Sequence, residues 1–132
     1  MIIVDASAAV DLLLEAAGPG EWVAERLEGE RNVGAPQLID LEVLSSLRKL
    51  VSRREITPTR AQDARRDLAA LGLVRYPVTG LVDRIWQLRD RMTPYDAAYV
   101  VLAEALRVPL VTTDERLGRT RGHRTEIVVF PS

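Results

Sequence analysis

The chain has 132 residues, so we expect one domain spanning residues 1–132 with a single hydrophobic core. Its 18 basic and 19 acidic side chains give a net charge of −1, which excludes a surface that is strongly basic all over. With no cysteine and only one histidine, the chain excludes disulfides and thiolate metal sites and makes a catalytic zinc improbable, so any metal should be held by oxygen.

Short apolar runs alternate with amphipathic stretches from one end of the chain to the other. In chain order, the expected elements are a strand at 2–4, helices at 7–15 and 21–28, a strand at 33–35, helices at 36–51 and 58–70, a strand at 73–78, helices at 81–91 and 94–107, a strand at 110–112, a short helix after 114 and a strand at 127–130. This alternation indicates an α/β fold, a three-layer sandwich with a mostly parallel central sheet flanked by helices.

Prolines mark three of the expected helix starts. Thr57-Pro58 and Thr93-Pro94 each combine a capping residue with a proline at the first helical position. Pro36 is expected in a first helical turn for the same reason. The longest apolar run, residues 97–103, is too short to cross a bilayer, and no signal peptide is evident, so we expect a cytoplasmic protein.

Four acidic residues are placed to meet where the strands end, and in α/β folds ligands bind outside the carboxyl ends of the strands. Asp5 directly follows the first strand, and Asp114 follows the fourth. Asp96 lies in the first turn of the helix that opens with Thr93, and Glu42 lies among apolar residues in the helix begun at residue 36. Each acid alone has an ordinary explanation, as a cap, a turn residue, a partner of the helix dipole or a solvated side chain.

Asp40 competes with Glu42 for a place in this group. Two residues apart on a helix, the two side chains point to nearly opposite sides. Asp40 lies nearer the helix start, where interaction with the helix dipole is a sufficient explanation. We therefore assign Glu42 to the group and leave Asp40 out.

Carboxylates gathered in one pocket repel and raise one another's pKa unless a cation neutralises them. A group of acids without histidine or cysteine is the ligand set that Mg²⁺ or Mn²⁺ prefers. Such ions lower the pKa of a bound water and stabilise a leaving oxygen, as phosphodiester hydrolysis requires.

Each of the four acids lies in a short sequence segment. The first segment is IVDASA at 3–8, and the second covers 38–48 with Glu42-Val43 and Leu47-Arg48. The third is TPYDAAY at 93–99 followed by Leu102-Ala103, and the fourth is LVTTD at 110–114 followed by Leu117. In order and spacing they resemble the PIN-domain family, in particular the VapC toxins of bacterial toxin–antitoxin modules. The third segment is the most specific, and the resemblance spans nearly the whole chain.

The resemblance implies a Mg²⁺- or Mn²⁺-dependent endoribonuclease that acts on RNA, is inhibited by a cognate antitoxin protein and forms a homodimer. Carried over to this sequence, it makes Asp5 and Asp96 the principal metal ligands. Glu42 and Asp114 would complete the catalytic site, partly through metal-bound water. The apolar surfaces at 12–14 and 47–51 are candidate docking faces for the antitoxin, with core packing as the alternative.

Other polar residues have competing interpretations. Ser7 and Thr112 could be supporting hydroxyls near the metal or could serve in capping and strand packing. His123 could contact RNA together with Arg116, Arg119, Arg121 and Arg124, but a charged loop is more often only solvated, which we prefer. A Ser7–His123–Asp triad lacks a nucleophile-elbow pattern.

Four rival functions share some of these sequence features. A phosphoacceptor signalling domain usually has an acidic pair after its first strand, and a haloacid-type phosphatase needs Asp-x-Asp there, whereas this chain has Asp5-Ala6-Ser7. A binding module that only keeps the fold would have no need for four acids. A non-toxic RNA-processing nuclease would have the same site. The RNA target and the identity of the antitoxin stay open.

Overall fold

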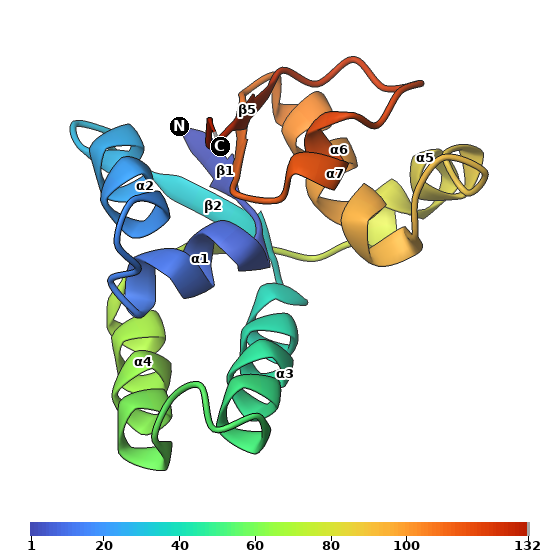
Figure 1. The fold of residues 1–132 in the computed structure, drawn as a ribbon. Helices are drawn as coiled ribbons and strands as arrows, with labels where there is room; N and C mark the ends of the chain where they lie inside the picture. Colours follow the sequence, from blue (N-terminus) through green and yellow to red (C-terminus); the bar gives the residue numbers. More distant parts are fainter. Residues whose placement is uncertain (132) are drawn as a thin grey trace.

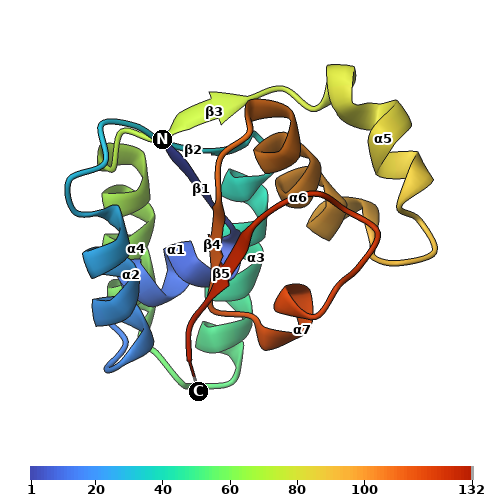
Figure 2. The same ribbon diagram turned by 90° about the horizontal axis from the view of Figure 1, so that it is seen from above.

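The computed structural model describes residues 1–131 and has a five-stranded sheet between two layers of helices (Figures 1 and 2). The sheet order is β3-β2-β1-β4-β5, and every pairing is parallel. The strands are β1 (Ile2–Val4), β2 (Val33–Pro36), β3 (Val74–Tyr76), β4 (Leu110–Thr112) and β5 (Ile127–Val129). The predicted three-layer α/β sandwich is confirmed.

The helices cover both faces of this sheet. They are α1 (Ala6–Leu13), α2 (Pro19–Leu27), α3 (Ile39–Ser52), α4 (Pro58–Ala70), the 3₁₀ turn η1 (Thr79–Leu81), α5 (Val82–Gln87), α6 (Pro94–Leu106) and α7 (Glu115–Gly118). Figures 1 and 2 show α1 and α2 on one face and α6 on the other, with α3 and α4 packed as a pair beside α1. Within residues 1–131, no helix has both the length and the apolar character that crossing a membrane requires.

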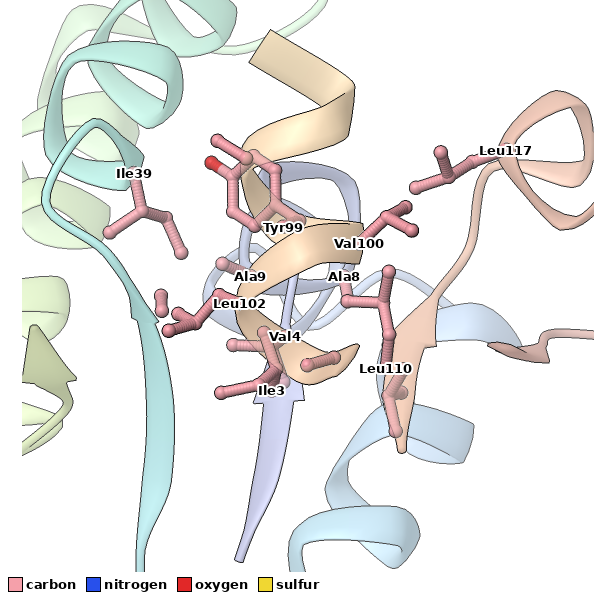
Figure 3. Close-up of a cluster of buried hydrophobic side chains, with 14 of the residues drawn as sticks. Ile3, Val4, Ala8, Ala9, Ile39, Tyr99, Val100, Leu102, Leu110 and Leu117 are labelled. Carbon is pink, nitrogen blue, oxygen red and sulfur yellow. The ribbon is translucent and has the colours of Figure 1, made fainter. Parts of the chain in front are cut away.

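The core lies between β1 and α6. All three residues of β1 are buried, and so are seven consecutive residues of α6, Ala97 through Ala103. Figure 3 shows side chains of Ile3 and Val4 beside Leu102 of α6 in this layer. Because α6 is buried around its middle and leads back into β4, its first turn is held at the edge of the sheet where the strands end.

The expected helix start at Pro36 is wrong, because Pro36 is the last residue of β2 and α3 begins at Ile39. Pro36 pairs in register with Tyr76 of β3, and the N–H of the next residue, Gln37, donates to the Tyr76 carbonyl at 2.9 Å. The missing proline N–H is therefore not needed in the ladder. The helix expected at 81–91 is also shorter, ending at Gln87.

Candidate active site

The four candidate acids each stand at the start of a helix, on the edge where the parallel strands end. Asp5 is the N-cap of α1 and Asp114 is the N-cap of α7. Asp96 and Glu42 lie in the first turns of α6 and α3. The arrangement follows from the topology, because each of these helices begins at the carboxyl edge of the sheet. Helix N-termini carry partial positive charge, so the edge favours negative groups.

Asp5 is buried, with only 5% of its surface exposed. Its Oδ1 accepts hydrogen bonds from the Ser7 hydroxyl at 2.7 Å and the Ala8 N–H at 2.9 Å, and its Oδ2 accepts one from the Thr112 hydroxyl at 2.5 Å. These bonds lower the pKa of Asp5, but burial outweighs them and, with a smaller contribution from the charge of Asp114, raises it to about 6. The carboxylate is thus held in a fixed orientation at an energetic cost.

Ser7 and Thr112 form the rest of this network. Their hydroxyl oxygens lie 3.1 Å apart, and Thr112 also accepts a hydrogen bond from the Asp114 N–H at 3.0 Å. The N–H of Thr113 donates to the Ser7 hydroxyl at 3.3 Å. Through these bonds the ends of β1 and β4 hold Asp5 and the backbone of Asp114 in one unit.

Glu42, in the first turn of α3, is half-buried. Burial raises the pKa of Glu42 and the charge of Asp96 adds to the rise, while the Tyr99 hydroxyl opposes it. Tyr99 is 2% exposed, and among the buried side-chain polar atoms of residues 1–131 its hydroxyl alone lacks a hydrogen-bond partner. Burial first, and then Glu42, Asp5 and Asp96, raise the pKa of Tyr99. An unpartnered hydroxyl therefore stands within electrostatic reach of three of the four acids.

Asp96 and Asp114 are partly exposed and share one cation. Arg116 Nη2 lies 2.9 Å from Asp96 Oδ2 and 3.0 Å from Asp114 Oδ2. Both carboxylates raise the pKa of the Arg116 guanidinium, Asp96 more than Asp114. The Arg116 side chain is 63% exposed, so these ion pairs are solvated and contribute little to stability.

The chemistry of this donor set suits a hard divalent cation. Four carboxylates and no histidine or cysteine are brought to one edge, and neither Asp5 nor Glu42 forms an ion pair within residues 1–131. In the observed side-chain positions, no three acids of the described chain are arranged to hold one ion together. The exposed guanidinium of Arg116 would have to move aside for Asp96 and Asp114 to turn toward a shared cation.

Asp40 is engaged elsewhere. It forms a two-pronged ion pair with Arg75 of β3, with distances of 2.7 and 2.8 Å. The helix-dipole explanation expected for Asp40 is therefore incomplete, because a partner 35 residues away accounts for its position. No local sequence signal connects these two residues.

His123 stabilises the loop that follows α7 through hydrogen bonds within that loop. The N–H of Thr125 donates to His123 Nδ1 at 3.1 Å, and His123 Nε2 lies 3.1 Å from the Thr120 carbonyl, which can only accept. This pattern places the ring proton on Nε2. The Ser7 hydroxyl donates to Asp5 instead of facing His123, so the triad is excluded.

Comparison with known proteins assigns the family. The PIN domain family model matches residues 2–122. The chain is 40% identical over 131 residues to "Ribonuclease VapC9" of Mycobacterium tuberculosis, covering 99% of each chain. It is 42% identical over 127 residues to "Ribonuclease VapC12" of the same organism, covering 96% of this chain and 97% of the relative.

Two solved structures share the fold. One is the crystal structure of VapBC2 from Rickettsia felis bound to a DNA fragment from their promoter, with a TM-score of 0.69 and 13% identity over 99% of this chain and 100% of the other. The other is VapC20 of Mycobacterium tuberculosis, described as a sarcin-ricin loop cleaving toxin, with a TM-score of 0.67 and 16% identity over 89% and 93%. At these identities the similarity concerns the fold, whereas the sequence matches over almost the full chain show that the protein belongs to the PIN-domain family and, within it, to the VapC ribonucleases.

Proposed function

We propose that the protein is a Mg²⁺- or Mn²⁺-dependent endoribonuclease that hydrolyses RNA phosphodiester bonds, and that it is the toxin of a type II toxin–antitoxin pair. The observation that carries this proposal is the placement of Asp5, Glu42, Asp96 and Asp114 at helix starts along one sheet edge. Its support from relatives is the full-length similarity to proteins named VapC ribonucleases.

The metal would be held by these four carboxylates, with Asp5 and Asp96 as principal ligands and Glu42 and Asp114 completing the site. Two features of the molecule support this. Burial raises the pKa of Asp5 and Glu42 despite nearby hydroxyl and N–H donors, so the charge of both acids is only partly compensated. The Tyr99 hydroxyl is without a partner beside them. When bound, a divalent cation would lower the pKa of the attacking water and stabilise the leaving oxygen.

The chain's own residues would orient the reaction. Ser7, Ala8 and Thr112 fix both oxygens of Asp5, so this ligand would need little reorganisation. Arg116, drawn to Asp96 and Asp114, would hold their carboxylates in place until a cation or a substrate displaces it. Helix N-termini around the site would favour a phosphate as well as carboxylates.

The antitoxin would cover the site with an apolar segment and a basic side chain. A hollow of about 410 Å³ lies between α3 and α4 and is lined in part by Leu44, Leu47 and Val51. A second, of about 480 Å³, lies between α1 and α3 and includes Leu14. An antitoxin Arg or Lys placed among the four acids would form charge-assisted hydrogen bonds there, as Arg116 does now. A homodimer is proposed from the family resemblance alone.

Two experiments test this proposal, an RNA cleavage assay and a growth assay. Purified protein should cleave RNA with Mg²⁺ or Mn²⁺ and stop when a chelator is added, whereas undiminished cleavage in chelator would overturn the metal mechanism. Cells that make this chain alone should stop growing, and co-expression of the adjacent small reading frame should rescue them. Normal growth with well-expressed, catalytically active protein would remove the toxin assignment and leave an RNA-processing nuclease.

A further inference from the structure

A second charged feature lies beside the carboxylates. It is a hollow of about 470 Å³, the arginine hollow, lined by Asp90, Arg91, Arg116, Arg119, Thr120 and Arg121. Four of these six residues are arginines with exposed side chains, although the whole chain has a net charge of −1. Positive charge is therefore concentrated at this place and is not a general property of the surface.

Arg116 belongs both to the arginine hollow and to the candidate active site. Its guanidinium bonds Asp96 and Asp114, while the same side chain forms part of the wall of the hollow. A nucleic-acid backbone that runs from the carboxylates past Arg116 would therefore enter the arginine hollow directly.

Most of the positive charge in the hollow is available to a ligand. Arg91 and Arg121 form no ion pair with any residue in 1–131. Arg119 pairs with Glu115 at 3.1 Å, but both side chains are exposed, so the pair is weak and easily exchanged. Asp90 is the one acid in the lining.

The loop that carries Arg119 and Arg121 is held in place rather than free. His123 bonds to Thr120 and Thr125 within the loop. The Thr125 hydroxyl donates to the Val100 carbonyl of α6 at 2.7 Å, and Arg84 of α5 donates to the Gly122 carbonyl at 3.1 Å. A ligand that binds this loop would not have to order it first, which reduces the entropy cost of binding.

We propose that the arginine hollow binds backbone phosphates of single-stranded RNA on one side of the cleaved bond, in place of the merely solvated loop that the sequence alone favoured. The inference rests on the proposed function, which places the reacting phosphate at the carboxylates. One guanidinium group can donate two parallel hydrogen bonds to two oxygens of a phosphate. The hollow's lining contains no hydrophobic side chain, whereas the centre of a protein–protein interface usually does. Contacts to phosphates add affinity without choosing a sequence.

The experiment measures binding without cleavage. A fluorescent single-stranded 2′-O-methyl RNA, which lacks the free 2′-hydroxyl, is titrated with the protein in chelator over a series of salt concentrations. The test variant is Arg119→Gln/Arg121→Gln. The matched control is Arg31→Gln/Arg66→Gln, which removes the same charge from two exposed arginines. Arg31 precedes β2, and Arg66 lies on α4. Figure 1 shows α4 on the opposite side of the molecule from α7.

Loss of two phosphate contacts should reduce the slope of log affinity against log salt by about 1.4 and weaken binding roughly 10- to 30-fold near 0.1 M salt. The control should bind like the unchanged protein. In cleavage assays with Mg²⁺, the test variant should raise KM more than it lowers kcat. Thermal melting should be the same for all three proteins, since the altered side chains are exposed.

Equal binding by the test variant and the control would overturn the inference, as would an undetectable affinity of the unchanged protein at low salt. Unchanged RNA binding together with weakened antitoxin binding would identify the hollow as a protein-docking surface and also overturn it. Because the binding measurement contains no metal and no cleavage, its result is separate from that of the nuclease test. A protein that binds RNA through the hollow but never cleaves it would contradict the proposed function alone.

Discussion

The two halves of the acidic group differ although both stand at helix N-termini on one edge. The inner half, Asp5 and Glu42, is buried or half-buried, has no ion pair within residues 1–131, and has raised pKa values. The outer half, Asp96 and Asp114, is partly exposed and shares the guanidinium of Arg116. Within the inner half, hydrogen bonds fix the carboxylate of Asp5 but do not offset the cost of its burial, whereas in the outer half a displaceable cation lies beside both carboxylates.

The difference shows where the energetic cost of the group resides. A carboxylate that stays buried without a counter-charge destabilises the folded protein, while one that faces solvent beside an arginine does not. We expect a bound divalent cation to relieve mainly the inner half. The following variants separate the two halves.

The largest effect should be on cleavage. Asp5→Asn and Asp96→Asn should each reduce RNA cleavage in Mg²⁺ at least 100-fold, on the order of the several kcal/mol that a metal contributes to transition-state stabilisation. Asp40→Asn should leave cleavage nearly unchanged, because Asp40 is paired with Arg75 outside the site. Loss of activity in Asp40→Asn with full activity in Glu42→Gln would show that the acid on α3 is wrongly assigned.

The second prediction concerns stability without metal. Because the pKa of Asp5 is raised from 3.8 to about 6, the folded protein keeps a proton there that the unfolded chain releases, so stability should fall as pH rises from about 4 to about 6 and stay low above that range. Asp5→Asn should remove much of this decline and raise the free energy of unfolding at pH 7 by up to about 3 kcal/mol.

Urea denaturation in chelator, measured at several pH values, tests this prediction. Asp96→Asn is the matched variant from the outer half: it gives up one ion pair with Arg116 and should destabilise the protein by no more than about 1 kcal/mol. Equal changes in both variants would mean that the two halves do not differ in the way described.

A smaller effect is expected at Tyr99. Its buried hydroxyl has no hydrogen-bond partner within residues 1–131 and acts on Glu42 only by lowering the pKa of that acid, so at about pH 4, where Glu42 is mostly protonated, Tyr99→Phe should raise the stability of the metal-free protein in urea denaturation by about 1 kcal/mol. Tyr76→Phe is the control, since the Tyr76 hydroxyl contacts the Met1 sulfur at 3.6 Å and its removal should give no gain. A clear loss of stability in Tyr99→Phe would show that the hydroxyl is bonded in solution.

The smallest effect should come from replacing Arg116, the cation that Asp96 and Asp114 share. Arg116→Gln removes a group that competes for Asp96 and Asp114, so Mn²⁺ should bind a few-fold more tightly, consistent with exposed ion pairs worth up to about 1 kcal/mol. Calorimetric titration with Mn²⁺ alone measures this, with Arg66→Gln as the control for the lost charge. Weaker binding in Arg116→Gln would mean that the arginine supports the metal site.

The position of the acids could be predicted because it depends on local signals. Asp5 follows a β-branched strand directly, and Asp96 follows a Thr-Pro helix start, so topology alone brings them to one edge. Pro36 was harder, because a proline fits both the end of a strand and the start of a helix. Its pairing with Tyr76, 40 residues away, decides between the two.

The electrostatic partners could not be predicted in the same way. The contact of Arg116 with Asp114 is local, but its second contact, with Asp96, spans 20 residues and depends on how α7 lies against α6. The pair of Asp40 with Arg75 depends on the neighbouring placement of β3 and α3. Likewise, sequence reasoning passed over Tyr99, because only packing shows that its hydroxyl is buried without a partner.

The hydrogen bond from Thr112 to Asp5 also bears on when the protein can act during its synthesis. It joins residues 107 positions apart, and β1, which leads into Asp5, has β4 as one of its two neighbours in the sheet. A growing chain on the ribosome acquires Asp5, Glu42 and Asp96 before it has the strand that fixes Asp5 in place. Such long-range parallel pairing is slow to form. Because Asp114 and the strand that fixes Asp5 both come late in the sequence, the proposed nuclease would become competent only after most of the chain has been translated.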